Sequence, residues 1–354
     1  MSVAGSEVTG AVGDTVTALP LLVGVAVVAD LRLTWLLVWF GVFQVVWGAY
    51  YGLPLSVEPM KALSGLLLAG ALTTGEFLVA GLLASVVLLA VGATDSLARV
   101  ESSLAEPVVR GVQFAVALVL LRTGVELGVA DPLLAGGGAA LALVVLALDR
   151  WNLTALAVLA AGGVLAVAST GVPVPAVPPV PVPSLGVPDL TGAALGATVA
   201  QLSMTVGNAA VATSLLLEDL YDRDVSPDEL SVSMGLMNLV AVPLGGLPMC
   251  HGSGGVAGKH TFGARTVTAN LVVGGIYLAL GVGAVGLLAA YPEAILGVVL
   301  VLVALGLART SFRTDDYALV AGVGVLGLLT NVGLALLAGV LFDRARSRWL
   351  TDAD

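Results

Sequence analysis

Long apolar stretches recur along almost the whole chain and are separated by short polar turns. Runs such as LLVGVAVVA and GLLASVVLLAVGA are continuous and do not alternate at every second residue, which predicts helices and not the strands of a membrane barrel. Because a helix of about 18 or more apolar residues can span a bilayer, we expect an all-α polytopic membrane protein. The predicted segments are 10–29, 34–51, 55–71, 75–93, 107–127, 131–148 and 152–169, and then 190–216, 229–246, 250–259, 266–290, 293–308, 315–330 and 331–343.

A proline-rich stretch, GVPVPAVPPVPVPSLGVPDL, divides the chain into two parts of seven predicted segments each. Its composition favours an extended polyproline conformation. In each half one segment, near 55–71 and near 250–259, is interrupted by glycine, proline and polar residues and predicts a broken half-helix. We therefore assign 1–170 to the first half, 171–190 to a linker and 191–354 to the second half.

The two halves resemble each other when the chain is shifted so that residue 39 lies on residue 233. WFGVFQVVWGAYYGLP then lies on SMGLMNLVAVPLGGLP, with Gln44 on Asn238 and an unbroken Gly-Leu-Pro on Gly-Leu-Pro. At the same shift Val12-Gly13-Asp14 lies on Val206-Gly207-Asn208. Since seven is an odd number of crossings, a second copy would be inserted upside down, which predicts an inverted repeat.

The basic residues favour a topology with both termini in the cytoplasm. Following fourteen crossings from a cytoplasmic N-terminus places ten arginines and Lys259 inside, Arg32 and Arg122 outside, and Lys61 within a span. The linker is then extracellular and the plasma membrane is the expected location. The first apolar run follows no basic n-region, so we interpret it as a span and not as a cleaved signal peptide.

Composition excludes several function classes. A net charge of −10 argues against a nucleic-acid partner and suits a high-salt cytoplasm, as in halophiles. Two histidines and one cysteine are too few for a typical zinc site or an internal disulfide, so we expect neither a metal nor a cofactor. The chain contains neither a GxxxxGK[ST] phosphate loop nor a GxSxG elbow, and we expect no enzyme activity.

The two broken segments are the best candidates for a binding site. Each carries a proline-led approach to a helix start, PLSVEPMKALSG at 54–65 and PMCHGSGGVAG at 248–258. Free backbone N–H groups and the helix dipole make such starts favourable for an anion, and in transporters with inverted repeats they meet near the membrane midplane. Close helix packing is the alternative role for these glycines and prolines.

Polar side chains inside the predicted spans extend this candidate site, because such residues are costly in a membrane. They are Asp14 near Thr17, the pair Glu58 and Lys61, the stripe Gln201, Thr205 and Asn208, and His251. For the pair a structural ion pair is an equal alternative, for the stripe interhelical hydrogen bonding, and for His251 packing or backbone capping. Glu58, His251 and Asp14 are the candidates for proton coupling.

At these stretches the sequence resembles the molybdate transporter family, which is related to sulfate permeases. The resemblance rests on GDTVTALP at 13–20, SVEPMKA at 56–62, QLSMTVGNA at 201–209 and the long GLMNLVAVPLGGLPMCHGSGGVAGKHTFGAR at 235–265. It implies uptake of molybdate, with sulfate and tungstate as alternatives, without the regulatory C-terminal domain of sulfate permeases. It also implies the seven-plus-seven inverted fold of sulfate and uracil permeases. Spans 1–4 and 8–11 would form a core domain, and spans 5–7 and 12–14 a gate domain that often forms a homodimer.

Two positions depart from the family pattern. Glu58 stands where the resemblance implies a neutral glutamine, and Ser203 stands where it implies proline. The substrate-binding residues expected from the residues and the resemblance together are Asp14, Thr17, Glu58, Pro59, Met60, Lys61, Gln201, Thr205, Asn208, His251, Gly252, Ser253 and Gly254.

The sequence thus predicts a secondary transporter that imports a tetrahedral oxyanion by alternating access, driven by a proton or cation gradient. Two alternatives stay open at this point. One is a nucleobase or aromatic-carboxylate proton symporter of the same fold, which Glu58 would suit. The other is a passive anion channel, which would conduct without saturating.

Overall fold

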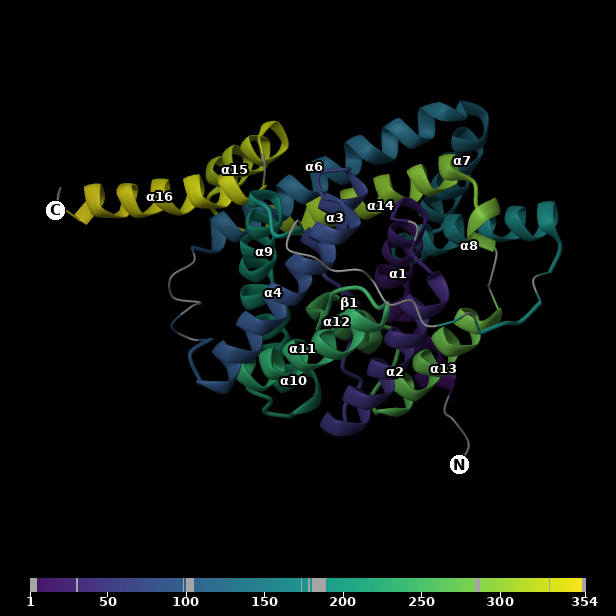
Figure 1. Cartoon of the computed structure of the whole chain (residues 1–354), viewed down its shortest axis with the longest axis horizontal. Helices are drawn as coiled ribbons and strands as arrows, with labels where there is room; N and C mark the ends of the chain where they lie inside the picture. Colours follow the sequence, from purple (N-terminus) through teal and green to yellow (C-terminus); the bar gives the residue numbers. More distant parts are fainter. Residues whose placement is uncertain are drawn as a thin grey trace.

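The computed structural model describes residues 5–29, 31–97, 99, 105–172, 174–177, 179, 189–283, 287–330 and 332–351, without the side chains of 12, 14, 16, 17, 152, 288, 289 and 347–351. Most of the described chain is helical (Figure 1). The helices of the first half are α1 Gly5–Val28, α2 Leu33–Tyr51, α3 Lys61–Leu68, α4 Thr74–Ala93, α6 Glu106–Ala130, α7 Pro132–Ala147 and α8 Trp151–Thr170. Those of the second half are α9 Gly192–Met204, a π-helical stretch Thr205–Val211, α10 Ala212–Tyr221, α11 Pro227–Ala241, α12 Ser253–Thr261, α13 Thr268–Gly283, α14 Glu293–Ser311, α15 Tyr317–Leu329 and α16 Val332–Thr351.

The helices confirm an all-α membrane protein. Every predicted segment overlaps a helix, and among the described residues six helices are long and apolar enough to cross a bilayer, with four shorter apolar helices beside them. The number of crossings and the inverted orientation of the halves stay predictions.

Several predicted bounds were wrong for identifiable reasons. The segment 229–246 ends as an α-helix at Ala241, because Pro243 follows and Gly245 adopts a left-handed φ of 82°. The segment 55–71 becomes helical only at Lys61, after an extended approach. The segment 266–290 contains α13 and a 3₁₀ turn at Leu287–Ala290, and residues 284–286 between them lie outside the described residues.

The helices form two groups by their contacts. In one group, α1, α2, α3 and α4 pack with α9 to α13, and in the other α6, α7 and α8 pack with α14, α15 and α16 (Figure 1). These groups contain the spans that the resemblance assigns to a core and a gate domain. The division into a core and a gate domain stays a prediction. It requires that the helices within each group pack together, as they do here.

Glycines let helices of the core group cross at close range. A Cβ at Gly41 of α2 would lie 2.8 Å from the carbonyl oxygen of Gly274 in α13. At the sequence-matched Gly235 of α11, a Cβ would lie 2.8 Å from the carbonyl oxygen of Ser85 in α4. Both distances are too short for a real side chain, so these crossings require glycine.

Neighbouring glycines in α13 provide a matched test of this packing. Gly274→Ala should destabilise the protein by about 1–3 kcal/mol, because its Cβ would meet Val45 Cγ2 at 2.6 Å as well as Gly41. Gly275→Ala, whose Cβ would meet nothing within 4 Å, has the same gain in helix propensity without the clash. Thermal unfolding in detergent should show a lower Tm for the first variant only; equal Tm values would refute the close crossing.

Candidate functional site

Two short extended strands join the broken segments at the centre of the core group. β1 Glu58–Pro59 pairs antiparallel with β2 Met249–Cys250, and the Met60 N–H donates to the Pro248 carbonyl at 2.9 Å. Proline keeps the residue before it out of the helical region, so both approaches stay extended until α3 and α12 begin. The prediction of two proline-led half-helices is confirmed, and their starts are brought together.

Carboxamide side chains hold the two extended approaches in place. Gln44 Nε2 donates to the Val57 carbonyl at 3.1 Å, and Asn238 exchanges two hydrogen bonds of 2.6 Å with the backbone N–H and carbonyl of Met249. Both side chains are fully buried. Gln44 and Asn238, which the sequence shift places on each other, therefore each hydrogen-bond the extended stretch before the half-helix of their own half.

Lys259 ends the broken segment predicted near 250–259, and the charge pattern counts it on the cytoplasmic side, which stays a prediction. It lies in the last turn of α12 with no exposed surface. Its ammonium donates to Gln44 Oε1 at 2.8 Å, Asn270 Oδ1 at 2.7 Å and the Leu55 carbonyl at 3.0 Å. One signal was available in the sequence: the chain has only two lysines, and each lies in one of the broken segments.

A cavity of about 630 Å³ separates the two helix groups next to the starts of α3 and α12. This volume falls in the usual range of small-molecule sites, about 300–1,000 Å³. Its polar lining carries three cations, Lys61 from the core group and Arg110 and Arg313 from the other group, and no carboxylate among the described lining residues. The cavity runs from the half-helix starts to Arg110 near the start of α6, Trp151 at the start of α8 and Arg313, which lies just after the end of α14.

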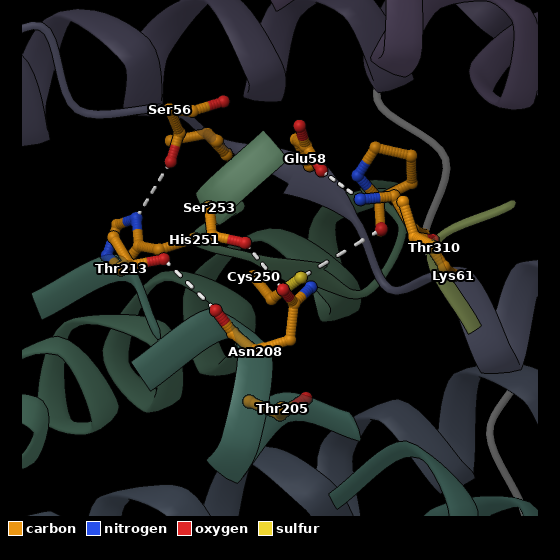
Figure 2. A network of polar contacts seen from close by, with 12 residues as sticks. Ser56, Glu58, Lys61, Thr205, Asn208, Thr213, Cys250, His251, Ser253 and Thr310 are labelled. Atoms are coloured by element: carbon orange, nitrogen blue, oxygen red, sulfur yellow. Dashed lines mark hydrogen bonds and ion pairs between the residues drawn. The ribbon is translucent and has the colours of Figure 1, made fainter. Parts of the chain in front are cut away.

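Four of the predicted site residues line this cavity: Lys61, Asn208, Ser253 and Gly254. Ser253 is the first residue of α12, and its hydroxyl hydrogen-bonds Asn208 Oδ1 (Figure 2). No described residue accepts a hydrogen bond from the backbone N–H groups of Ser253 and Gly254. The start of α12 therefore presents donors toward the cavity, as an anion site requires.

Gln201 and Thr205 lie behind this lining and hold the start of α3. Gln201 Oε1 accepts from the N–H groups of Ala62 at 2.9 Å and Leu63 at 3.2 Å, and its Nε2 donates to Thr205 Oγ1 at 2.8 Å. The predicted single stripe through Asn208 is interrupted because the helix widens into a π-helix at Thr205. Gln201 therefore fits the alternative of interhelical hydrogen bonding, and Thr205 accepts a hydrogen bond from its side chain within the same helical segment.

Glu58 and Lys61 form an ion pair just beside the cavity. Glu58 is fully buried, and the side chain of Lys61 is 15% exposed and reaches the lining (Figure 2). The carboxyl group of Glu58 also lies against Gly252, where an added Cβ would stand 2.2 Å from Glu58 Cδ. The Glu58–Lys61 pair and the start of α12 therefore form one cluster. Pro59, Met60 and Gly252 contribute their backbone to this cluster.

His251 directly follows β2 and is fully buried, with its ring directed toward Ser56 (Figure 2). Its Nδ1 donates to the Ser56 carbonyl at 3.0 Å, since a carbonyl can only accept. Its Nε2 then contacts the Ser233 hydroxyl at 2.7 Å and accepts from it in the neutral imidazole. The cavity lining does not include His251, and its contacts fit the capping alternative.

Asp14 and Thr17 lie on α1, but their side chains are outside the described residues. Among the described residues no group of three or more His, Cys, Asp or Glu side chains could hold a metal ion.

Comparison with known proteins gives one family. The model of the family described as "Molybdate transporter of MFS superfamily" matches residues 6–120 and again 193–307. Two curated relatives from Arabidopsis thaliana are each 27% identical over 95% of this chain: molybdate transporter 2, covered over 86% of its length, and molybdate transporter 1, covered over 87%. Molybdate transporter 1 of Chlamydomonas reinhardtii is 34% identical over 44% of this chain and 33% of its own length.

Solved structures share the fold. The transmembrane domain of the cyanobacterial bicarbonate transporter BicA aligns with a TM-score of 0.68 at 18% identity, covering 95% of this chain and 97% of that one. Murine solute carrier 26 family member A9, an anion transporter in the inward-facing state, aligns with a TM-score of 0.69 at 14% identity over 99% of this chain and 69% of that one. The family and these neighbours are transporters, not enzymes.

Proposed function

The chain belongs to the molybdate transporter family, and we propose that it imports a tetrahedral oxyanion, with molybdate as the first candidate substrate. The observation that carries this proposal is the cavity lining: three cations and no carboxylate among the described lining residues, beside a half-helix start with N–H donors facing inward. A neutral nucleobase has no need of three cations. Sulfate and tungstate have the same shape and charge as molybdate and stay alternatives.

The substrate would bind with its oxygens on Lys61, Ser253, the Gly254 N–H and Asn208. Gln201 and Thr205 would set the position of α3, and Thr17 and Asp14 would approach from α1. Backbone donors and one ammonium suit a tetrahedral dianion because they can meet several oxygens at once.

The transport cycle would be alternating access, in which the core group moves against the gate group. If the ends that carry Arg110 and Arg313 face the cytoplasm, the cavity lies on the inner side of the half-helix starts, as expected of an inward-facing conformation. The gate group would also form the contact of a homodimer in the plasma membrane.

Uptake of a dianion needs an energy source, because a negative-inside potential opposes it by roughly 2.3 kcal/mol per charge per 100 mV. A symported proton or cation would supply it. Glu58 is the first candidate carrier, ahead of His251 and Asp14. An ionised carboxylate beside a bound dianion would repel it, which is why Glu58 is the first candidate for accepting the symported proton.

Radiotracer uptake into proteoliposomes tests the function. We expect saturable molybdate uptake that is faster with an inward proton gradient and is inhibited by tungstate and sulfate. Uptake that rises linearly with concentration, together with conductance in a planar bilayer, would indicate a channel. Competition by uracil or an aromatic carboxylate, but by no oxyanion, would indicate the other symporter class.

A further inference from the structure

We propose that Glu58 is a tethered internal anion that takes the place of the substrate while the transporter is empty. This substitution would allow the empty core group to reorient, so that the protein carries out net uptake and not only exchange of one anion for another. The inference rests on the proposed function and concerns a different step, the return of the unloaded carrier.

The first observation is that Glu58 is bound to the cation proposed to hold the substrate. Its carboxylate pairs with the Lys61 ammonium, three residues further along the chain. Lys61 lines the cavity, whereas Glu58 is fully buried and is not part of the lining; Figure 2 shows the contact between the two side chains. An oxyanion arriving from the cavity therefore meets an ammonium that already carries a carboxylate on its far side.

The second observation is that the same carboxylate lies at the start of α12. A Cβ at Gly252 would lie 2.3 Å from Glu58 Oε2 and 2.7 Å from Oε1, so only a glycine leaves room for the carboxyl group there. Gly252 directly precedes Ser253, where the helix begins and its dipole favours negative charge. Glu58 thus contacts both groups that the substrate would use, an ammonium and a half-helix start.

The third observation is that the other half-helix start also carries an oxygen of the protein. Gln201 Oε1 accepts from the Ala62 and Leu63 N–H groups of α3. In this structure, an internal carboxylate lies against the start of α12 and an internal carboxamide oxygen against the start of α3. Of these two internal groups only the Glu58 carboxylate is charged, and it is the one that pairs with Lys61.

Reorientation of the core group moves its charges within the membrane, and an uncompensated charge makes this movement costly. A core that carries the Lys61 ammonium together with the Glu58 carboxylate has no net charge from this pair, so it can reorient without a ligand. When the oxyanion binds, it takes over Lys61, and Glu58 accepts the coupled proton. Without the Glu58 carboxylate, the oxyanion itself would have to supply the negative charge in both directions, which is the behaviour of an exchanger.

The experiment compares two modes of transport in the same proteoliposomes. Net uptake of labelled molybdate is measured into vesicles without internal oxyanion, and exchange is measured into vesicles loaded with unlabelled molybdate. For Glu58→Gln we expect net uptake to fall at least tenfold and exchange to fall no more than about threefold. Glu58→Asp, which keeps the charge, should restore most of the ratio of net uptake to exchange.

Equal losses in both modes, or an unchanged ratio, would overturn the inference. If Glu58→Gln does not fold, Gly252→Ala provides the test, because its methyl group must displace the carboxylate from α12 and should lower the same ratio. An unchanged ratio in that variant would also overturn it. If the unaltered protein neither takes up nor exchanges any oxyanion, the proposed function itself fails, which is a distinct result.

Discussion

Replacing Lys61 with glutamine is expected to reduce oxyanion uptake at least a hundredfold. Lys61 is the cation of the cavity that lies at a half-helix start, and only 15% of its side chain is exposed. Removing one member of a buried, hydrogen-bonded charge pair typically costs about 2–5 kcal/mol, and roughly 2.7 kcal/mol corresponds to a hundredfold loss of binding. Initial rates of molybdate uptake, and the rise in Tm that molybdate produces in detergent, measure the effect.

Arg313→Gln is the matched control for this prediction. It removes the same charge from the lining of the same cavity, but at an exposed position. Solvent and salt screen such a charge, so uptake should fall less than about fivefold. Equal effects of the two substitutions would show that the cavity attracts anions by its overall charge and has no specific site at Lys61. A folded Lys61→Gln protein that keeps more than a tenth of the uptake would refute the role of Lys61.

The broken segments could be predicted because their signal is local. Proline, glycine and polar residues interrupt an otherwise apolar run, and Pro59 and Pro248 keep the chain extended until the helices begin at Lys61 and Ser253. The ion pair of Glu58 with Lys61 was likewise visible from a spacing of three residues. Features that depend on residues close together in the sequence could therefore be predicted.

The role of Gln201 could not be predicted, because its partners lie far away in the sequence. It contacts the start of α3 at Ala62 and Leu63, in the other half of the chain. A polar residue on a membrane helix has the same sequence signature whether it binds a substrate or a neighbouring helix. The π-helix at Thr205–Val211 has the same origin, since nothing in TVGNAAV by itself distinguishes it from an α-helix.

Lys259 shows what counting charges leaves out. The positive-inside rule predicts on which side of the membrane a lysine near the end of a span lies, but it does not predict whether its side chain is buried. Its burial depends on Gln44 in α2 and Asn270 in α13, which only the folded chain brings to it. Asn270 in turn donates to the carbonyls of Gln44 and Leu55. The side chains of Lys259, Gln44 and Asn270 together therefore hold the extended stretch before α3 by hydrogen bonds.

Lys259→Met should therefore be the most destabilising single substitution considered for this chain. Methionine keeps the length and the apolar packing of the stem, but it leaves Gln44 Oε1 and Asn270 Oδ1 buried without the ammonium that donates to them. An unsatisfied buried acceptor costs about 1–3 kcal/mol, and two of them give a loss of roughly 2–6 kcal/mol.

Thermal unfolding in detergent should show this loss as a large fall in Tm, or as failure to obtain folded protein at all. Arg122→Met is the control, because it removes a cation whose side chain is 70% exposed and whose partner Glu126 is one helical turn away. Such an exposed pair contributes about 0–1 kcal/mol, so Tm should barely change. A Lys259→Met protein as stable as the Arg122→Met protein would mean that the ammonium is not what holds Leu55 and the approach to α3. Because that approach carries Glu58 to its place beside Lys61, any folded Lys259→Met protein should also lose uptake, even at temperatures well below its Tm.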